Sequence, residues 1–139
     1  MNALVDTSVW SLALRRKASD LNTEETAVVD ELTHLVREGR ARVIGLVRQE
    51  LLSGIKTSGQ YERLRNILRT FPDELLDTAD YEAAADAGNK CRAKGIATTL
   101  ADMLICAVVQ ARDWSVFSTD PDFHKYIKIL PIKLHVPRR

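Results

Sequence analysis

The chain has 139 residues and a mass of 15.6 kDa, and we expect one domain over residues 1–139 with one sizeable core. Hydrophobic residues make up 45% of the chain and charged residues 28%, which excludes disordered and fibrous proteins. The 20 basic and 19 acidic residues give a net charge of +1, which by itself indicates neither a nucleic-acid nor a membrane partner.

Short apolar runs alternate with segments in which apolar residues recur at helical spacing. The runs predict buried strands and the periodic segments predict helices. Strands that alternate with helices indicate an α/β protein with a parallel sheet covered on both faces. In chain order we expect strand 3–5, helix 7–14, loop 15–22, helix 23–38, strand 42–46, helix 47–55, helix 61–71, strand 75–76, helix 79–94, helix 99–110, strand 114–117, helix 122–127 and strand 132–136.

Cysteine usage and hydropathy indicate a cytoplasmic protein without a membrane segment. Cys91 and Cys106 lack the paired spacing of a zinc site and are too few for a disulfide scaffold, so we expect reduced packing thiols. The longest apolar run, Met103–Val109, is far short of the ~20 residues that a membrane helix needs. Asp6 interrupts any signal-peptide core near the start.

Acidic residues follow the predicted strands at their carboxyl ends. Asp6 directly follows strand 3–5, Asp120 follows strand 114–117, and Glu50 lies a few residues beyond the second strand. Parallel sheets keep their chemistry at this edge. Asp102 is the only charged residue between positions 99 and 111, in a helix apolar on every side. A carboxylate is costly to bury among apolar residues without a partner, so Asp102 indicates a functional site.

Each of these acids also has a structural alternative. Asp6 is well suited to cap the helix that follows it, and Asp102 to form a capping box with Thr99. Glu50, taken alone, is a typical solvated helix acid. Asp120 precedes Pro121, as many turn residues do, and Asp122 is suited to cap the next helix. We therefore prefer Asp120 to Asp122 as the fourth acid.

Four carboxylates converging at one edge would repel one another unless divalent cations lay between them. Oxygen ligands without Cys or His suit Mg²⁺ or Mn²⁺ better than zinc. Such ions activate water and stabilise the attacking and leaving oxygens of phosphodiester cleavage. With these four acids neutralised, 15 acidic residues remain against 20 basic ones, which is compatible with RNA binding.

At these residues the chain resembles the PIN-domain ribonucleases, specifically the VapC toxins of bacterial and archaeal toxin–antitoxin pairs. Each matching segment is weak alone, and the four in order are strong. They are LVDTSVW at 4–10, VRQELLSG at 47–54, LADMLICAVVQ at 100–110 and VFSTDPDF at 116–123.

The resemblance implies a PIN-like three-layer α/β/α sandwich with a central, mostly parallel sheet, and a metal-dependent endoribonuclease. It further implies an RNA substrate, a cognate VapB-type antitoxin, a homodimer and a Mg²⁺ (or Mn²⁺) cofactor. Asp6 and Asp102 would bind the metal, with Glu50 and Asp120 as further acidic ligands. The supporting residues would be Thr7, Ser8, Thr119 and Asp122.

Two other functions remain open at this point. A receiver-like signalling module would need adjacent acids after the first strand and a lysine after a late one, but Asp6 is single and no lysine follows Asp120 before Lys125. A PIN scaffold that binds partners without catalysis would not need all four acids. Several basic residues are candidate RNA contacts or merely a solvated face: Arg15, Arg16, Lys17, Lys56, Arg63, Arg65 and Arg69.

Overall fold

The computed structural model describes residues 1–139 and contains a four-stranded, all-parallel sheet. The strands are short, and the two central ones, β1 and β3, are buried along their whole length. In spatial order they are β2 (Ala41–Arg42), β1 (Ala3–Val5), β3 (Ser115–Phe117) and β4 (Lys133–Leu134). Leu4 of β1 pairs with Arg42 on one side and Val116 on the other, so strands from both ends of the chain meet at the centre of the sheet.

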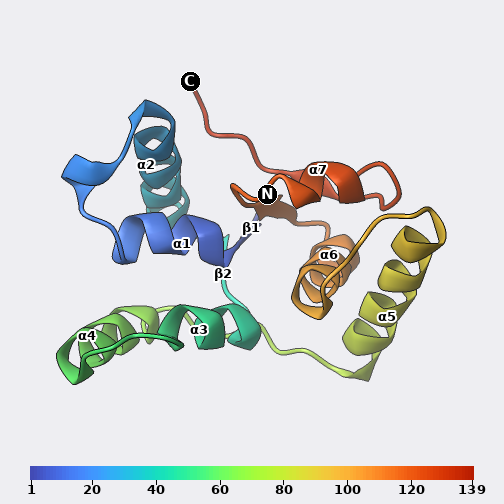
Figure 1. Ribbon diagram of the computed structural model, residues 1–139, viewed down its shortest axis with the longest axis horizontal. Coiled ribbons are helices and arrows are strands. Elements are labelled where there is room, and N and C mark those ends of the chain that lie inside the picture. The colour runs from blue at the N-terminus through green and yellow to red at the C-terminus, as the bar shows by residue number, and fades with distance from the viewer.

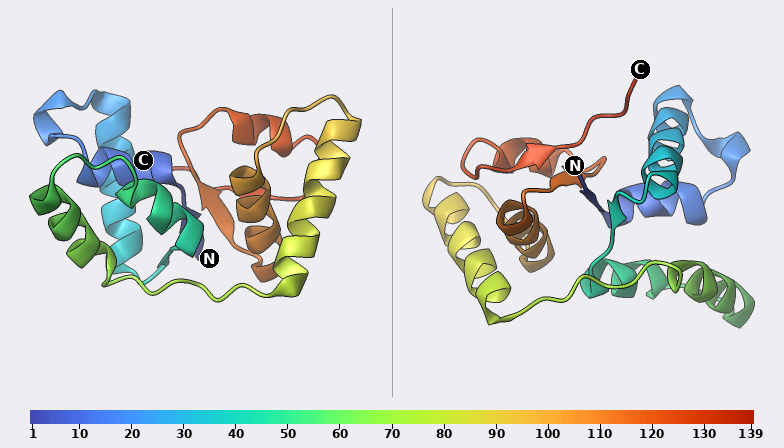
Figure 2. Two further views of the ribbon diagram at one scale, coloured as in Figure 1. Left: turned by 60° about the horizontal axis from the view of Figure 1, so that its bottom comes forward. Right: turned by 180° about the vertical axis from the view of Figure 1, so that it is seen from behind.

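Helices cover both faces of the sheet, as the sequence predicts. Helices α1 and α2 lie on one side, and α5, α6 and α7 lie on the other (Figure 1). Helices α3 and α4 extend away from the sheet as an arm, which Figure 2 shows from two further directions. The helices are α1 (Thr7–Leu14), the 3₁₀ turn η1 (Ala18–Asp20), α2 (Thr23–Arg37), α3 (Gly45–Leu52), α4 (Ser58–Leu68), α5 (Thr78–Ala93), α6 (Leu100–Arg112) and α7 (Asp122–Tyr126).

Two of the expected strands differ from the structure. The second ends at Arg42, and α3 begins at Gly45, inside the segment 42–46 that we expected to be extended. A short apolar run fits a buried strand and a buried helix equally well, so periodicity did not locate this boundary. Segment 75–76 forms no strand, and the side chain of Leu75 is 86% exposed. Instead Asp73 makes an isolated parallel bridge with Val43.

The core lies between the sheet and its helices. All three residues of β1 are fully buried, and every residue of α6 from Met103 to Val109 is buried, as expected for a helix apolar on all sides. Cys91 and Cys106 are buried free thiols, which confirms their expected role as packing residues. None of the helices combines the length and the hydropathy needed to cross a membrane.

An ion cluster on the α2 side holds the last residues of the chain. Glu31 of α2 is only 2% exposed and accepts hydrogen bonds from His135 at 2.5 Å and from Arg138 Nε at 2.7 Å. Arg138 also donates to Glu38, at 3.0 Å. Burial alone would raise the pKa of Glu31, but the hydrogen bonds from Arg138 and His135 outweigh it and lower the pKa to about 2. The cluster therefore fastens the segment after β4 to α2.

We expect Arg138→Ala to lower the free energy of unfolding at pH 7, because it removes charged hydrogen bonds to the buried Glu31 carboxylate. Glu31 has a lowered pKa, so its contribution to stability is present above pH 4.5 and is lost as the pH falls toward 2. The difference from the wild type should shrink over that range. Urea unfolding at several pH values measures it, with Arg139→Ala as the control. Equal loss in both variants would contradict the assignment.

Candidate metal centre

Asp6 and Ser118 lie next to each other where β1 and β3 end. The Asp6 backbone amide donates to the carbonyl oxygen of Phe117 at 2.9 Å, which continues the pairing of the two strands. The Asp6 side chain is buried, so its carboxylate needs hydrogen-bond partners. Its Oδ2 accepts from Ser118 Oγ at 2.7 Å and from Ser8 Oγ at 3.0 Å. Asp6 occupies the N-cap position of α1, but its side chain makes no capping bond.

Asp102 enters the site from the first turn of α6. Thr99 is the N-cap residue, and its Oγ1 accepts from the Asp102 amide at 3.0 Å. The Asp102 carboxylate does not complete a capping box; its Oδ2 accepts from the hydroxyl of Tyr126 at 2.7 Å. Burial raises the pKa of Asp102, and the carboxylates of Asp6 and Asp120 raise it further. Asp102 is thus held close to two other acids.

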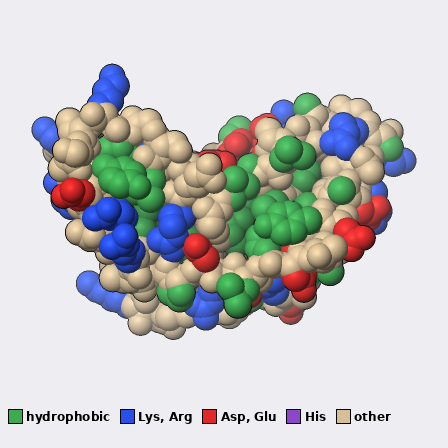
Figure 3. Space-filling view, turned by 90° about the horizontal axis from the view of Figure 1, so that it is seen from below, with side chains coloured by type: hydrophobic (Ala, Val, Ile, Leu, Met, Phe, Trp, Pro, Cys, Tyr) green, Lys and Arg blue, Asp and Glu red, His purple; other side chains and the backbone are tan.

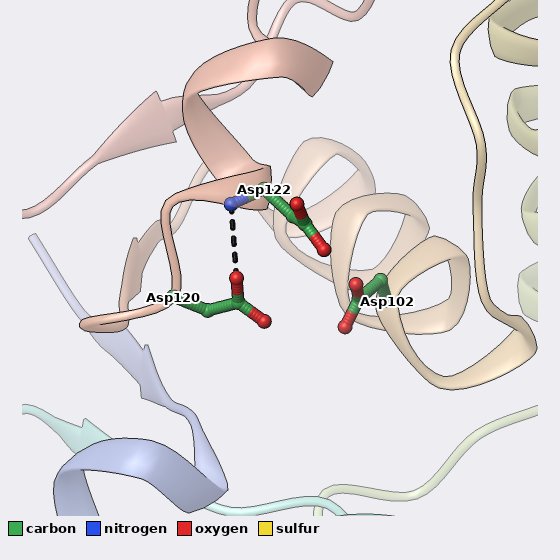
Figure 4. Close-up of side chains that lie close together, drawn as sticks. All are labelled: Asp102, Asp120 and Asp122. Carbon is green, nitrogen blue, oxygen red and sulfur yellow. Dashed lines mark hydrogen bonds between the residues drawn. The ribbon is translucent and has the colours of Figure 1, made fainter.

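Asp120 and Asp122 both face Asp102 (Figure 4). Each of the three offers a carboxylate oxygen, and these three oxygens all lie within 4.8 Å of one another. Asp120 Oδ1 accepts from the Asp122 amide at 2.9 Å. The N-cap position of α7 belongs to Pro121, and Asp122 is the first residue of that helix. Our expectation that Asp122 caps this helix was therefore wrong: Asp120 bonds the free amide, and the Asp122 carboxylate joins the cluster.

Glu50 lies outside this group of three carboxylates. It is the sixth residue of α3 and exposed, and its Oε2 accepts from Thr7 Oγ1 at 2.9 Å. Since Thr7 directly follows Asp6, this hydrogen bond ties Glu50 to the end of β1. The structure thus gathers Asp102, Asp120 and Asp122 and places Asp6 beside them. Glu50 is connected to the centre through Thr7.

Of the predicted hydroxyl residues, Thr7 and Ser8 contact the acids, but the Thr119 side chain is exposed and makes no hydrogen bond. Thr119 takes part only through its backbone amide, which donates to Ser8 Oγ at 3.0 Å. Besides Ser8, the hydroxyl that reaches Asp6 belongs to Ser118, whose Oγ also accepts from the Asp120 amide at 3.0 Å. Sequence analysis missed Ser118 by one position. Its place directly after β3, across from Asp6, is the signal that would have found it.

The partners of these carboxylates differ from those of the acids elsewhere in the protein. Glu31 and Asp80 are buried and bonded to arginines. By contrast, four acids of the site accept hydrogen bonds only from neutral hydroxyl or backbone donors, and no Lys, Arg or His lies within ion-pair distance of them. These four acids are Asp6, Glu50, Asp102 and Asp120. Asp122 alone has a cation nearby, the exposed Lys125 at 3.3 Å. No basic side chain therefore compensates the negative charge of the other four acids.

Comparison with protein families identifies this arrangement. The family model described as PIN domain matches residues 3–129. The chain belongs to the PIN domain family. This confirms the family and the α/β fold that the motifs predict, and it excludes the receiver-like alternative. No curated protein matches the chain at a significant level.

Solved structures share this PIN fold over nearly the whole chain. FitAcB from Neisseria gonorrhoeae has a TM-score of 0.76 at 20% identity, covering 97% of both chains. VapBC2 from Rickettsia felis, bound to a DNA fragment from its promoter, has a TM-score of 0.72 at 16% identity, covering 97% of this chain and 98% of that one. VapBC-1 from nontypeable Haemophilus influenzae has a TM-score of 0.71 at 11% identity, covering 97% of each.

The donor set of this PIN domain fits a hard divalent cation. Every candidate ligand is a carboxylate oxygen, and no His or Cys belongs to the cluster. Oxygen-only sites suit Mg²⁺ and Mn²⁺, whereas zinc sites use His and Cys. A divalent cation between these acids would stabilise the folded protein, since it would offset the repulsion among their carboxylates.

Proposed function

We propose that this PIN domain is the toxin of a toxin–antitoxin pair and acts in the cytoplasm as a Mg²⁺- or Mn²⁺-dependent endoribonuclease. The observation that carries the proposal is that three acids of the site lie close together without a basic side chain beside them. Asp6, Asp102 and Asp120 converge without a protein cation, although arginines neutralise the acids that serve the fold, such as Glu31 and Asp80. A divalent cation bound between these acids would offset their repulsion.

Within this proposal, Asp6, Asp102, Asp120 and Asp122 hold the metal, and Glu50 is a further acidic ligand. A bound Mg²⁺ or Mn²⁺ would activate water and stabilise the attacking and leaving oxygens of the phosphodiester. The hydroxyls fix the carboxylates: Ser8 and Ser118 hold Asp6, and Thr7 holds Glu50. Because these donors are neutral, they orient the acids without cancelling their charge.

A basic groove on the α4 side of the molecule supports an RNA substrate. Arg15, Lys56 and Arg63 line it, above a floor that includes Leu14 and Leu64. Figure 3 shows Lys and Arg side chains gathered on this side of the face. Cations spaced along a groove bind the phosphate backbone, and such binding weakens as salt is added. We propose that RNA reaches the carboxylates along this groove.

The proposed partners are an antitoxin and a second copy of the chain. The solved relatives are described as VapBC and FitAB complexes, which supports a VapB-type antitoxin. An apolar groove between α3, α5 and α6 supports a homodimer, because it leaves Tyr81 57% exposed and Leu100 91% exposed. Figure 3 shows hydrophobic side chains gathered in the hollow between α3 and α5.

RNA cleavage with paired variants tests the proposal. Asp120→Asn keeps an oxygen that accepts from the Asp122 amide and removes only the charge, so it should slow cleavage about 100-fold, comparable to removing one preorganised electrostatic group from an active site. Asp122→Asn should cost less, because Lys125 already offsets part of that charge. Single-turnover cleavage of total RNA in Mn²⁺ measures both rates. A wild type that leaves RNA intact in Mg²⁺ and Mn²⁺ would favour a PIN scaffold without catalysis.

A further inference from the structure

The side chain of Tyr126 connects the interior of the protein to the acidic centre. It belongs to α7, its ring is 1% exposed, and it packs edge-to-face on Phe123 with ring centroids 5.4 Å apart. Its hydroxyl donates to Asp102 Oδ2 at 2.7 Å. The Thr99 hydroxyl also lies beside this carboxylate and favours its charged form, and no basic side chain forms an ion pair with Asp102. The ring is therefore held by packing in the core, and its only polar atom, the hydroxyl oxygen, is hydrogen-bonded to Asp102.

We propose that Tyr126 is a positioning residue that fixes the Asp102 carboxylate for metal binding and leaves Oδ1 free as the ligand. The inference rests on the proposed function, because it assigns Asp102 a metal to bind. It adds a residue of α7 that lies outside the four sequence motifs.

The chemistry of the donor supports this role. A Lys or Arg at this place would neutralise Asp102, as Arg112 does for Asp80 with contacts at 2.8 and 3.0 Å. A phenol donates a hydrogen bond and brings no charge. The centre thus gains a fixed carboxylate that is still fully available to a cation.

The position of Tyr126 also links Asp102 to the other acids. Asp120 bonds the first amide of α7, Asp122 begins that helix, and Tyr126 ends it. Asp102 comes from α6, and the Tyr126–Asp102 hydrogen bond joins the two helices at the site. Groups that orient metal ligands typically change metal affinity 10- to 100-fold when they are removed.

The test is the Mn²⁺ affinity of the purified full-length protein, measured by titration calorimetry and by electron paramagnetic resonance of free Mn²⁺. Tyr126→Phe keeps the ring and removes the hydroxyl, and we expect Mn²⁺ to bind about tenfold more weakly. Excess Mn²⁺ should restore RNA cleavage, since the lost property is affinity. Tyr61→Phe is the control, because the Tyr61 hydroxyl makes no hydrogen bond and the ring lies on α4 under Arg65.

Two results would overturn the inference, and they differ from failure of the proposed function. If Tyr126→Phe lowers the melting temperature but binds Mn²⁺ as the wild type does, Tyr126 has only a structural role. If its cleavage stays low at saturating Mn²⁺, the hydroxyl does not act through affinity. Should Asp102→Asn also bind Mn²⁺ like the wild type, the acids are not the metal site, and the proposed function itself fails.

Discussion

Asp102→Asn should abolish RNA cleavage and leave the protein as stable as before or more stable. The amide cannot serve as an anionic ligand, and losing about 4 kcal/mol of transition-state stabilisation slows a reaction about 1000-fold. The gain in stability follows from the pKa of Asp102, which burial and the neighbouring carboxylates raise. A group whose pKa is raised on folding stabilises the fold below its ordinary pKa of 3.8, and that contribution is lost as the pH rises. The gain should therefore be largest at neutral pH.

Thermal melts without divalent ions, at pH 4 and pH 7, measure the stability, and single-turnover assays measure the rate. Asp30→Asn is the matched control, because it removes one exposed carboxylate from α2, on the other side of the sheet. It should change neither quantity. A lower melting temperature with cleavage retained in Asp102→Asn would instead mean that Asp102 only supports the start of α6.

Removing divalent ions should stop cleavage completely, and adding Mg²⁺ or Mn²⁺ should restore it. Metal binding should also stabilise the fold, because it relieves repulsion among Asp6, Asp102 and Asp120. An ion at 100 times its Kd adds about 2.7 kcal/mol, which raises the melting temperature of a domain of this size by about 10 °C. Assays in EDTA and melts across an Mn²⁺ titration measure both effects.

The two effects of metal should disappear together. Asp102→Asn should show a much smaller rise in melting temperature with Mn²⁺, whereas Asp30→Asn should respond like the wild type. Full cleavage in EDTA would exclude a metal mechanism. A rise in melting temperature that persists unchanged in Asp102→Asn would place the ion elsewhere on the protein.

The sequence predicts those parts of the fold and site that depend on local patterns. Two local patterns identify an acid of the site before the fold is known: the apolar run that precedes Asp6, and the apolar helix in which Asp102 is the single charge. Both acids lie where the pattern indicates, and Asp120 lies beside them. Segment 75–76 was not predictable in this way, because two apolar residues carry no period, and pairing elsewhere leaves Leu75 exposed.

The remaining site residues depend on contacts between distant segments. Successive residues at a strand end point to opposite sides, so the Ser118 hydroxyl bonds Asp6 whereas the Thr119 hydroxyl, one position later, faces solvent. Asp122 resembles a helix cap in sequence, and only the position of Pro121 shows that it is not one. The Tyr126 contact requires α7 to dock on α6, which no local pattern specifies.

The pairing of β1 with β3 also determines when the centre can exist during synthesis. The hydroxyl of Ser118 and the carboxylate of Asp6 that it holds are 112 residues apart in the chain. A nascent chain that has not yet reached β3 holds Asp6 and Glu50 but lacks Ser118, Asp120 and α7. Because residues emerge in order from the N-terminus, β1 cannot pair with β3 until Ser115–Phe117 has been synthesised. The carboxylate centre can therefore form only after β3 and α7 have been synthesised, although Asp6 is among the first residues of the chain.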